Sequence, residues 1–145
     1  MTGSAKSSNR SSNWNTAILY ACVAAGGVIG SVARYLVSLL IPFSGFPLAT
    51  LFVNVTGSFI IGFYSTITGP DGRVFAGTRQ RQFVMTGFCG GYTTFSAFSL
   101  ETFRLLHGGM TATALLNISV SVVTWLVAVW LGHVLASRLN RLKGS

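Results

Sequence analysis

The sequence predicts an all-α integral membrane protein with four membrane-spanning helices, the third of which is broken in the middle of the membrane. Its 145 residues are 50% hydrophobic and only 8% charged, and the mean hydropathy is +0.61. A typical globular domain has about 25% charged residues, so this chain cannot cover a water-facing surface. Because one spanning helix requires about 20 apolar residues, there is room for about four spans and no soluble catalytic domain.

Polar segments bound the predicted membrane domain at both ends. Residues 1–16 are rich in Ser and Asn and include Lys6 and Arg10, so we expect them to form a disordered leader. Residues 17–136 form the predicted four-helix transmembrane domain, and residues 137–145 form a basic tail that we expect in the cytoplasm.

The first two predicted spans are apolar runs separated by a short loop. The first covers residues 17–41, which is longer than the apolar region of about 7–15 residues in a secretory signal. The loop at residues 42–47 (PFSGFP) has two prolines and a glycine, which end one helix and start the next. The second span covers residues 48–68 and is followed by a turn at residues 69–72 and a basic segment that ends at Gln82.

The third predicted span, residues 83–106, contains an unusual run of small and polar residues. Gly90 and Gly91 precede Tyr92-Thr-Thr, and we expect this segment to break the helix and leave backbone groups without intrahelical partners. Exposed backbone at that depth is tolerated only where it is buried in protein or faces a cavity. The competing explanation of the glycines is close helix packing, as in the Gly26-x-x-x-Gly30 pattern of the first span.

A turn at residues 107–109 leads into the fourth span, residues 111–136, and the basic residues then predict the orientation. With four spans, both termini and the loop after the second span lie on one side of the membrane. Arg104 lies near the opposite end and Arg34 lies within the first span. The positive-inside rule predicts that the termini are cytoplasmic. Eight of the ten basic residues lie on that side: Lys6, Arg10, Arg73, Arg79, Arg81, Arg138, Arg141 and Lys143.

Several function classes are excluded by what the sequence lacks. There is no basic stripe with interleaved aromatic residues, so we expect no nucleic-acid partner. The chain has only two acidic residues, its two histidines lack partners at metal-ligand spacing, and no Walker or Rossmann glycine pattern occurs. We therefore expect no enzyme.

Polar side chains inside the spans are the candidate functional groups, because each must find a partner or line a wet path. Thr50, Asn54 and Ser58 recur every fourth residue and share one face of the second span. Asn54 either joins helices by hydrogen bonding or directs an amide donor into a pore. The same two interpretations apply to a polar face of the fourth span, formed by Asn117, Ser121 and Thr124.

The half-helix expected to begin near Thr94 places Phe95 and Phe98 next to each other. Such residues commonly supply apolar bulk, but phenylalanine ring edges are electropositive and can contact an anion in a dry constriction. Arg34 and Glu101 are the charges in or near the spans. They either form an ion pair that holds helices together, or Arg34 sets a positive potential at a vestibule.

Three motifs cover most of the predicted membrane domain. They are Gly27-x-x-Gly30-x-x-x-Arg34-Tyr35, then Thr50-Leu-x-x-Asn54-x-x-Gly57-Ser-Phe-x-x-Gly62, and then Gly87-Phe-Cys-Gly-Gly-Tyr-Thr-Thr-Phe-Ser-Ala-Phe-Ser99 followed by Glu101. Together they resemble the CrcB/Fluc family of fluoride channels, and the resemblance extends over residues 20–136. The third motif is the most specific.

The resemblance implies an antiparallel, dual-topology dimer of four-helix subunits with two fluoride pores and one structural sodium ion (Na+) at the dimer centre. By motif position, the pore residues that it implies are Asn54, Thr94, Phe95, Phe98 and Ser121. It also implies that Arg34 lies in a vestibule and that the backbone carbonyls of Gly90 and Thr93 hold the sodium ion. Trp125 stands one turn beyond Ser121, where the family can offer a further hydroxyl, so this end of the polar track differs.

The implied function is passive export of cytoplasmic fluoride through the cell membrane, which gives fluoride resistance. The main alternative is a small proton-coupled multidrug exporter of four-helix, dual-topology type, which needs a titratable carboxylate in its cavity. The first span has none, and Glu101 lies towards a helix end. A third possibility is a noncatalytic membrane assembly subunit. An antiparallel homodimer needs subunits that insert in both orientations, which requires little charge bias, whereas the basic residues here are divided eight to two. Either both orientations still occur and the dimer is a homodimer, or the chain pairs with an oppositely oriented paralogue.

Overall fold

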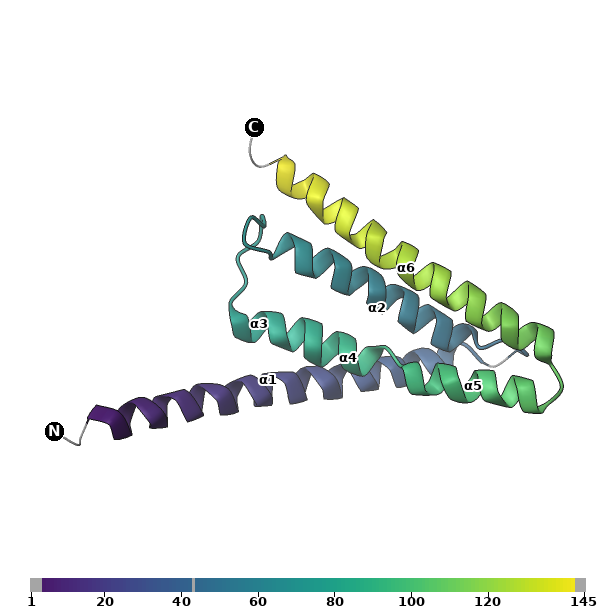
Figure 1. Cartoon of the computed structure of the whole chain (residues 1–145), viewed down its shortest axis with the longest axis horizontal. Helices are drawn as coiled ribbons and strands as arrows, with labels where there is room; N and C mark the ends of the chain where they lie inside the picture. The colour runs from purple at the N-terminus through teal and green to yellow at the C-terminus, as the bar shows by residue number, and fades with distance from the viewer. Residues whose placement is uncertain (1–3, 43, 143–145) are drawn as a thin grey trace.

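A computed structural model describes residues 4–42 and 44–142, and every regular element in these two ranges is a helix (Figure 1). In chain order the elements are α1 (Ser4–Leu40), α2 (Leu48–Ile67), α3 (Thr78–Gln82), the π-helix η1 (Phe83–Phe88), α4 (Cys89–Tyr92), α5 (Phe95–His107) and α6 (Thr111–Arg141).

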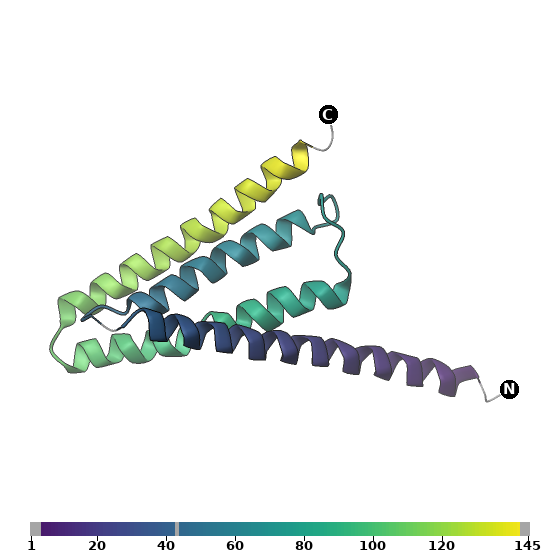
Figure 2. The ribbon, with the colours of Figure 1, turned by 180° about the vertical axis from the view of Figure 1, so that it is seen from behind.

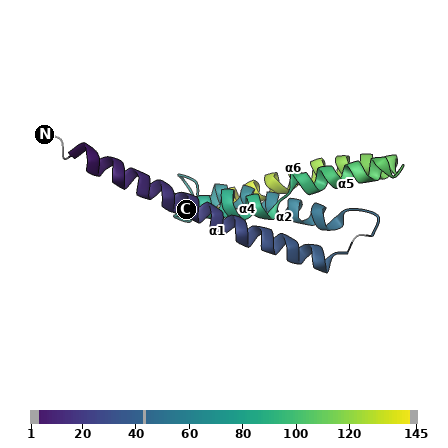
Figure 3. The same ribbon diagram turned by 90° about the horizontal axis from the view of Figure 1, so that it is seen from below.

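The helices run up and down, so that both chain ends and the α2–α3 loop lie at one end of the molecule (Figures 1 and 2). The α1–α2 loop and the α5–α6 turn lie at the other end. Helix α2 lies between α6 and the α3–α5 segment, and α1 crosses that segment at an angle (Figure 3). The start of α1, the end of α6 and the basic α2–α3 loop thus lie at the same end of the molecule, and their side of the membrane stays a prediction.

Three helical segments are long and apolar enough to cross a membrane: Trp14–Leu40, Leu48–Ile67 and Thr111–Arg141. They correspond to the first, second and fourth predicted spans. The third predicted span, residues 83–106, is divided between η1, α4 and α5. The interruption that the sequence predicts in this segment is therefore present.

The two ends of the chain contain more helix than the sequence predicts. Residues 4–16 of the expected disordered leader belong to α1, and residues 1–3 lie outside the described ranges. Ser and Asn cost only about 0.5 kcal/mol each in a helix, and an existing helix extends without a new nucleus. For the same reason α6 continues to Arg141, well into the predicted tail at residues 137–145.

Glycines allow α1 to pack against η1 and α4 with the two backbones in contact. A Cβ atom at Gly30 would lie 2.8 Å from the backbone nitrogen of Tyr92, and one at Gly87 would lie 2.7 Å from the carbonyl oxygen of Val23. A Cβ atom at Gly90 would meet nothing within 4 Å. Close helix packing, the competing explanation in the sequence, therefore accounts for Gly87 but not for Gly90.

Helices α2 and α6 pack along their length and form the support for the interrupted segment. A Cβ atom at Gly132 would lie 2.8 Å from the backbone nitrogen of Phe63, so small residues bring these helices close together as well. At the end near the α2–α3 loop, Asn140 joins α6 to α2 and to this loop. Its Nδ2 donates to the Thr66 carbonyl at 3.1 Å, and its Oδ1 accepts from the Arg73 N–H at 2.8 Å.

We predict that Gly30→Ala destabilises the protein, because the added Cβ atom would push α1 away from α4. Overpacking of this kind typically costs about 1–3 kcal/mol. The thermal unfolding midpoint of the detergent-solubilised protein should therefore fall. Gly27→Ala is the matched control, because its Cβ atom would meet only the Gly87 carbonyl oxygen, at 3.9 Å. Equal midpoints for the two variants would contradict the packing described here.

Candidate functional site

The helix break is a two-residue extended segment between α4 and α5. Thr93 has φ −79° and ψ 159°, and Thr94 has φ −153° and ψ 115°. The helix continues through Gly90 and Gly91 and ends at Tyr92. The break therefore falls at the two threonines rather than at the glycines, of which Gly91 packs against the backbone of Gly27 and Gly90 does not pack against another helix.

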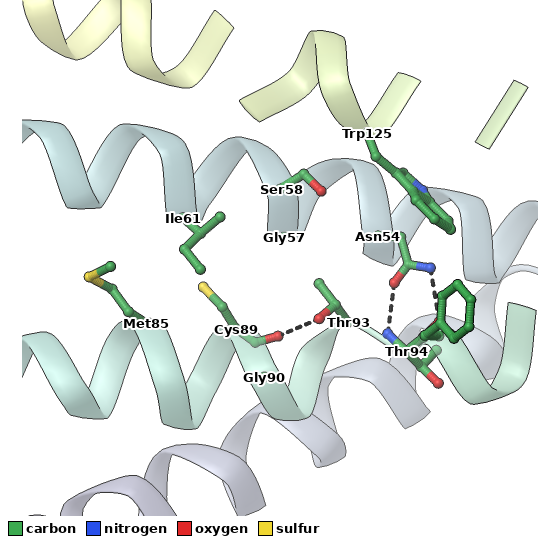
Figure 4. A pocket seen from close by; sticks show the side chains of 11 residues that line it. Asn54, Gly57, Ser58, Ile61, Met85, Cys89, Gly90, Thr93, Thr94 and Trp125 are labelled. Atoms are coloured by element: carbon green, nitrogen blue, oxygen red, sulfur yellow. Dashed lines mark hydrogen bonds between the residues drawn. The ribbon is translucent and has the colours of Figure 1, made fainter. Parts of the chain in front are cut away.

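The side chain of Asn54 on α2 spans this break (Figure 4). Its Oδ1 accepts a hydrogen bond from the Thr94 N–H at 2.7 Å, and its Nδ2 donates to the Thr94 carbonyl at 3.0 Å. Asn54 is buried, with 5% of its surface exposed. The carboxamide thus pairs with Thr94 as a neighbouring peptide group would in a sheet, which satisfies backbone groups that the break removes from the helix.

This pairing bears on the two interpretations that the sequence leaves open for Asn54, interhelical bonding and a donor directed into a pore. Interhelical bonding is present, and it uses only one of the two protons that Nδ2 carries. The second proton belongs to an amide group whose position is fixed by the first. A fixed donor loses little entropy when it contacts a ligand.

Two helical hydrogen bonds are replaced by side-chain bonds at the break. In an unbroken helix the Thr94 N–H would bond the Gly90 carbonyl, and the Ala97 N–H would bond the Thr93 carbonyl. Here Asn54 accepts from the first, and the Thr94 hydroxyl accepts from the second at 3.1 Å as the N-cap of α5. The carbonyls of Gly90 and Thr93 therefore lose their usual donors, and Gly90 is exposed.

A pocket of about 290 Å³ lies on one side of the break (Figure 4). Its lining comes from α2, η1, α4, the break, α5 and α6. The side chains that can take part in polar or ring-edge contacts there are Asn54, Ser58, Thr93, Thr94, Phe95 and Trp125. None of the lining residues is charged, so the pocket offers dipoles rather than a counter-charge.

A second pocket, of about 340 Å³, contains Arg34 and Glu101. Thr50 donates to Glu101 Oε1 at 2.8 Å, whereas Glu101 Oε2 and Arg34 Nε are buried without hydrogen-bond partners. The ion pair that the sequence allows between Arg34 and Glu101 is thus not formed within the described chain. Thr94 lines both pockets, so the Asn54–Thr94 pair lies between them.

Phe95 and Phe98 lie side by side at the start of α5, as their spacing predicts. Their ring centroids are 5.6 Å apart and the rings are tilted by 47°. Phe95 is 72% exposed and lines the first pocket, whereas Phe98 is 7% exposed and meets Trp125 edge to face with centroids 5.0 Å apart. In the first pocket Phe95 borders the space and Phe98 lies behind it, but both rings line a third pocket between α5 and α6.

Ser121, by contrast, lies outside the first pocket. Its hydroxyl donates to Asn117 at 3.4 Å, Asn117 donates to Thr102 at 2.9 Å, and Thr102 donates to the Phe98 carbonyl at 2.8 Å. This buried chain of hydrogen bonds joins α6 to α5. The sequence left open whether this polar face joins helices or lines a pore, and Asn117 joins helices. Ser58, which the sequence places on the same face of the second span as Asn54, lines the first pocket.

An interrupted membrane helix that presents uncharged polar groups and aromatic rings is typical of ion channels and transporters. Within the described residues there is no group of three or more His, Cys, Asp or Glu residues that could hold a metal ion. The chain belongs to the CrcB family, because the family described as "CrcB-like protein, Camphor Resistance (CrcB)" matches residues 21–133. It is a multi-pass protein of the cell membrane.

Curated relatives match nearly the whole chain. It is 67% identical over 133 residues to "Fluoride-specific ion channel FluC 1" of Bradyrhizobium diazoefficiens. The matched stretch covers 91% of this chain and 94% of that protein. It is also 67% identical over 132 residues to the protein of that name in Rhodopseudomonas palustris, with 89% and 94% covered. A "Fluoride-specific ion channel FluC" of Opitutus terrae is 53% identical over 130 residues, with 88% and 98% covered.

We predict that Asn54→Leu speeds hydrogen–deuterium exchange at the Thr94 amide, because the variant loses both bonds across the break. An unsatisfied buried group costs about 1–3 kcal/mol, so exchange should be about tenfold to a hundredfold faster. Asn54→Asp keeps the acceptor for the Thr94 N–H and should have a smaller effect. Asn117→Leu, which removes an equally buried amide from the α5–α6 contact, is the matched control. Unchanged exchange at Thr94 in Asn54→Leu would show that the pairing is not stable in solution.

Proposed function

We propose that this chain is a fluoride-selective ion channel that exports cytoplasmic fluoride passively and so confers fluoride resistance. The identity of the ion comes from the relatives named fluoride-specific ion channels, whose matches cover about nine-tenths of the chain. The observation that carries the proposal is the Asn54–Thr94 pair, which holds an amide donor beside Phe95 between two pockets. The protein is accordingly a channel and not an enzyme.

The physical task of such a channel is to replace the hydration of a small, strongly hydrated anion. Removing water from an ion is costly unless other groups supply the lost contacts. In the proposed pathway Arg34 attracts the anion into the second pocket, and the free amide proton of Asn54 and the ring edges of Phe95 and Phe98 replace water in stages. Ring edges attract an anion only weakly, which permits release. Ser121 is proposed as a further hydroxyl near this path.

The proposed channel has four spans per subunit, with η1, α4 and α5 together forming the interrupted one. Two subunits form an antiparallel, dual-topology dimer. The exposed backbone at Gly90 supports association, because polar backbone at membrane depth must be covered by protein or face a cavity. The partner is a second copy or an oppositely oriented paralogue, and efflux from liposomes that contain this chain alone would establish the former.

We also propose a structural Na+ ion at the dimer interface, held by the backbone carbonyls of Gly90 and Thr93. These are the two carbonyls whose usual helical donors are bonded elsewhere, and oxygen is the ligand that such a hard cation prefers. One chain contributes only two of them, so a second subunit would supply more. When bound, the ion would supply positive charge that stabilises the carbonyl dipoles at the break.

We predict that liposomes containing the protein release fluoride but not chloride, and that Phe95→Ile combined with Phe98→Ile abolishes this release. Isoleucine keeps apolar bulk but has no electropositive ring edge. The efflux rate, followed with a fluoride electrode, should fall by about a hundredfold or more, as when a preorganised charge-stabilising donor is removed.

Phe52→Ile is the control for this experiment, because Phe52 is 47% exposed on α2 and lines neither pocket. Wild-type efflux from the double variant would count against the proposed pathway. Efflux that requires an imposed proton gradient would instead favour the proton-coupled exporter.

We predict that replacing Na+ by K+ in the buffer lowers the thermal unfolding midpoint of the purified protein. A ligand present at a hundred times its dissociation constant stabilises the folded state by about 2.7 kcal/mol. The midpoint should recover as Na+ is added back at constant ionic strength. Identical midpoints in the two cations would refute the sodium site while leaving fluoride conduction unaffected.

A further inference from the structure

Trp125 is a polar residue of the first pocket that the proposed function leaves unused. Its indole nitrogen Nε1 is buried and has no hydrogen-bond partner, although the residue lines the pocket (Figure 4). Leaving a buried donor unsatisfied costs about 1–3 kcal/mol, so such groups are rare in folded proteins and need an explanation.

The surroundings of Trp125 in the pocket are rich in hydrogen-bond donors. Ser58 lies one turn from Asn54 on α2, and its hydroxyl makes no hydrogen bond to any residue that the structure describes. The second amide proton of Asn54 is a third donor, beside the Trp125 indole N–H and the Ser58 hydroxyl. Apart from the backbone carbonyls of Gly90 and Thr93, these groups are donors, and no side chain of the lining is a carboxylate. The donor side chains therefore suit a small anion.

The indole group is suited to an anion for two further reasons. It is a donor only and cannot accept a hydrogen bond, so it discriminates against ligands that must donate. Its ring is held edge to face against Phe98, with an interplanar angle of 74°, so its direction is fixed before a ligand arrives.

We propose that the Trp125 indole N–H donates a hydrogen bond to the permeating anion, and that with the Ser58 hydroxyl it forms a second fluoride position beyond Asn54 and Phe95. This inference rests on the proposed channel function. In this proposal the indole of Trp125 on α6 and the hydroxyl of Ser58 on α2 replace hydration water of the ion in the pocket. The competing explanation is structural, namely that the N–H points at the Phe98 ring in a weak N–H···π contact.

Fluoride efflux from liposomes tests the role of the donor. Trp125→Phe removes the N–H but keeps an aromatic ring against Phe98, and we expect efflux to fall about tenfold or more, the effect of losing one buried donor. Trp125→Thr supplies a hydroxyl donor and should recover a substantial part of the rate. Trp130→Phe is the matched control on the same helix, because Trp130 is 60% exposed and lines neither pocket. Its rate should equal that of the wild type.

A measurement on the wild-type protein keeps the test independent of variant folding. The chain has three tryptophans, Trp14, Trp125 and Trp130, so the ¹⁵N-labelled protein in micelles should give three indole N–H resonances. The resonance that is lost in Trp125→Phe should shift when chloride is replaced by fluoride, and the other two should not. An N–H bonded to the Phe98 ring would give no such fluoride-specific shift.

The outcomes separate the inference from the proposed function. If the wild-type protein conducts fluoride, but Trp125→Phe conducts equally well and the indole resonance is stationary, the inference is overturned and the channel function stands. If the wild-type protein conducts no fluoride, both fail. A selective shift together with loss of efflux in Trp125→Phe and recovery in Trp125→Thr supports the inference.

Discussion

The constraint on which this structure depends is that a polypeptide backbone cannot be left unsatisfied inside a membrane. The chain interrupts a helix at Thr93 and Thr94, and the freed groups find partners in side chains. Asn54 pairs with both polar groups of Thr94, and the Thr94 hydroxyl caps the following helix. Because these bonds satisfy the backbone groups, an extended segment can exist at membrane depth. That segment separates the two pockets.

The remaining structure holds Asn54 and the break in register. Close packing of α1 on η1 and α4 through glycines fixes one side of the break, and the α2–α6 contact fixes the helix that carries Asn54. A buried chain of polar groups from Ser121 to the Phe98 carbonyl attaches α5 to α6. Since helices attract one another in lipid mainly through packing and such hydrogen bonds, the small and polar residues of the spans have a common structural role.

The sequence was sufficient to predict the first, second and fourth spans, the loops and an interruption within residues 83–106, because hydropathy and residue composition are local properties. It did not fix the break at Thr93 and Thr94, since that position depends on Asn54, forty residues away. Neither could it decide between an ion pair and separate charges for Arg34 and Glu101, because the outcome depends on Thr50 bonding the carboxylate. The roles of individual residues in conduction stay predictions, because they depend on the permeating ion and on the proposed second subunit.

The central claim is that the pairing of Asn54 with Thr94 creates the ion pathway. The most direct test is fluoride-electrode recording from liposomes that contain Asn54→Leu, with incorporation of the variant into the membrane verified. If the claim is correct, fluoride release is no faster than from protein-free liposomes. Release at the wild-type rate from a variant that has lost both bonds would contradict it.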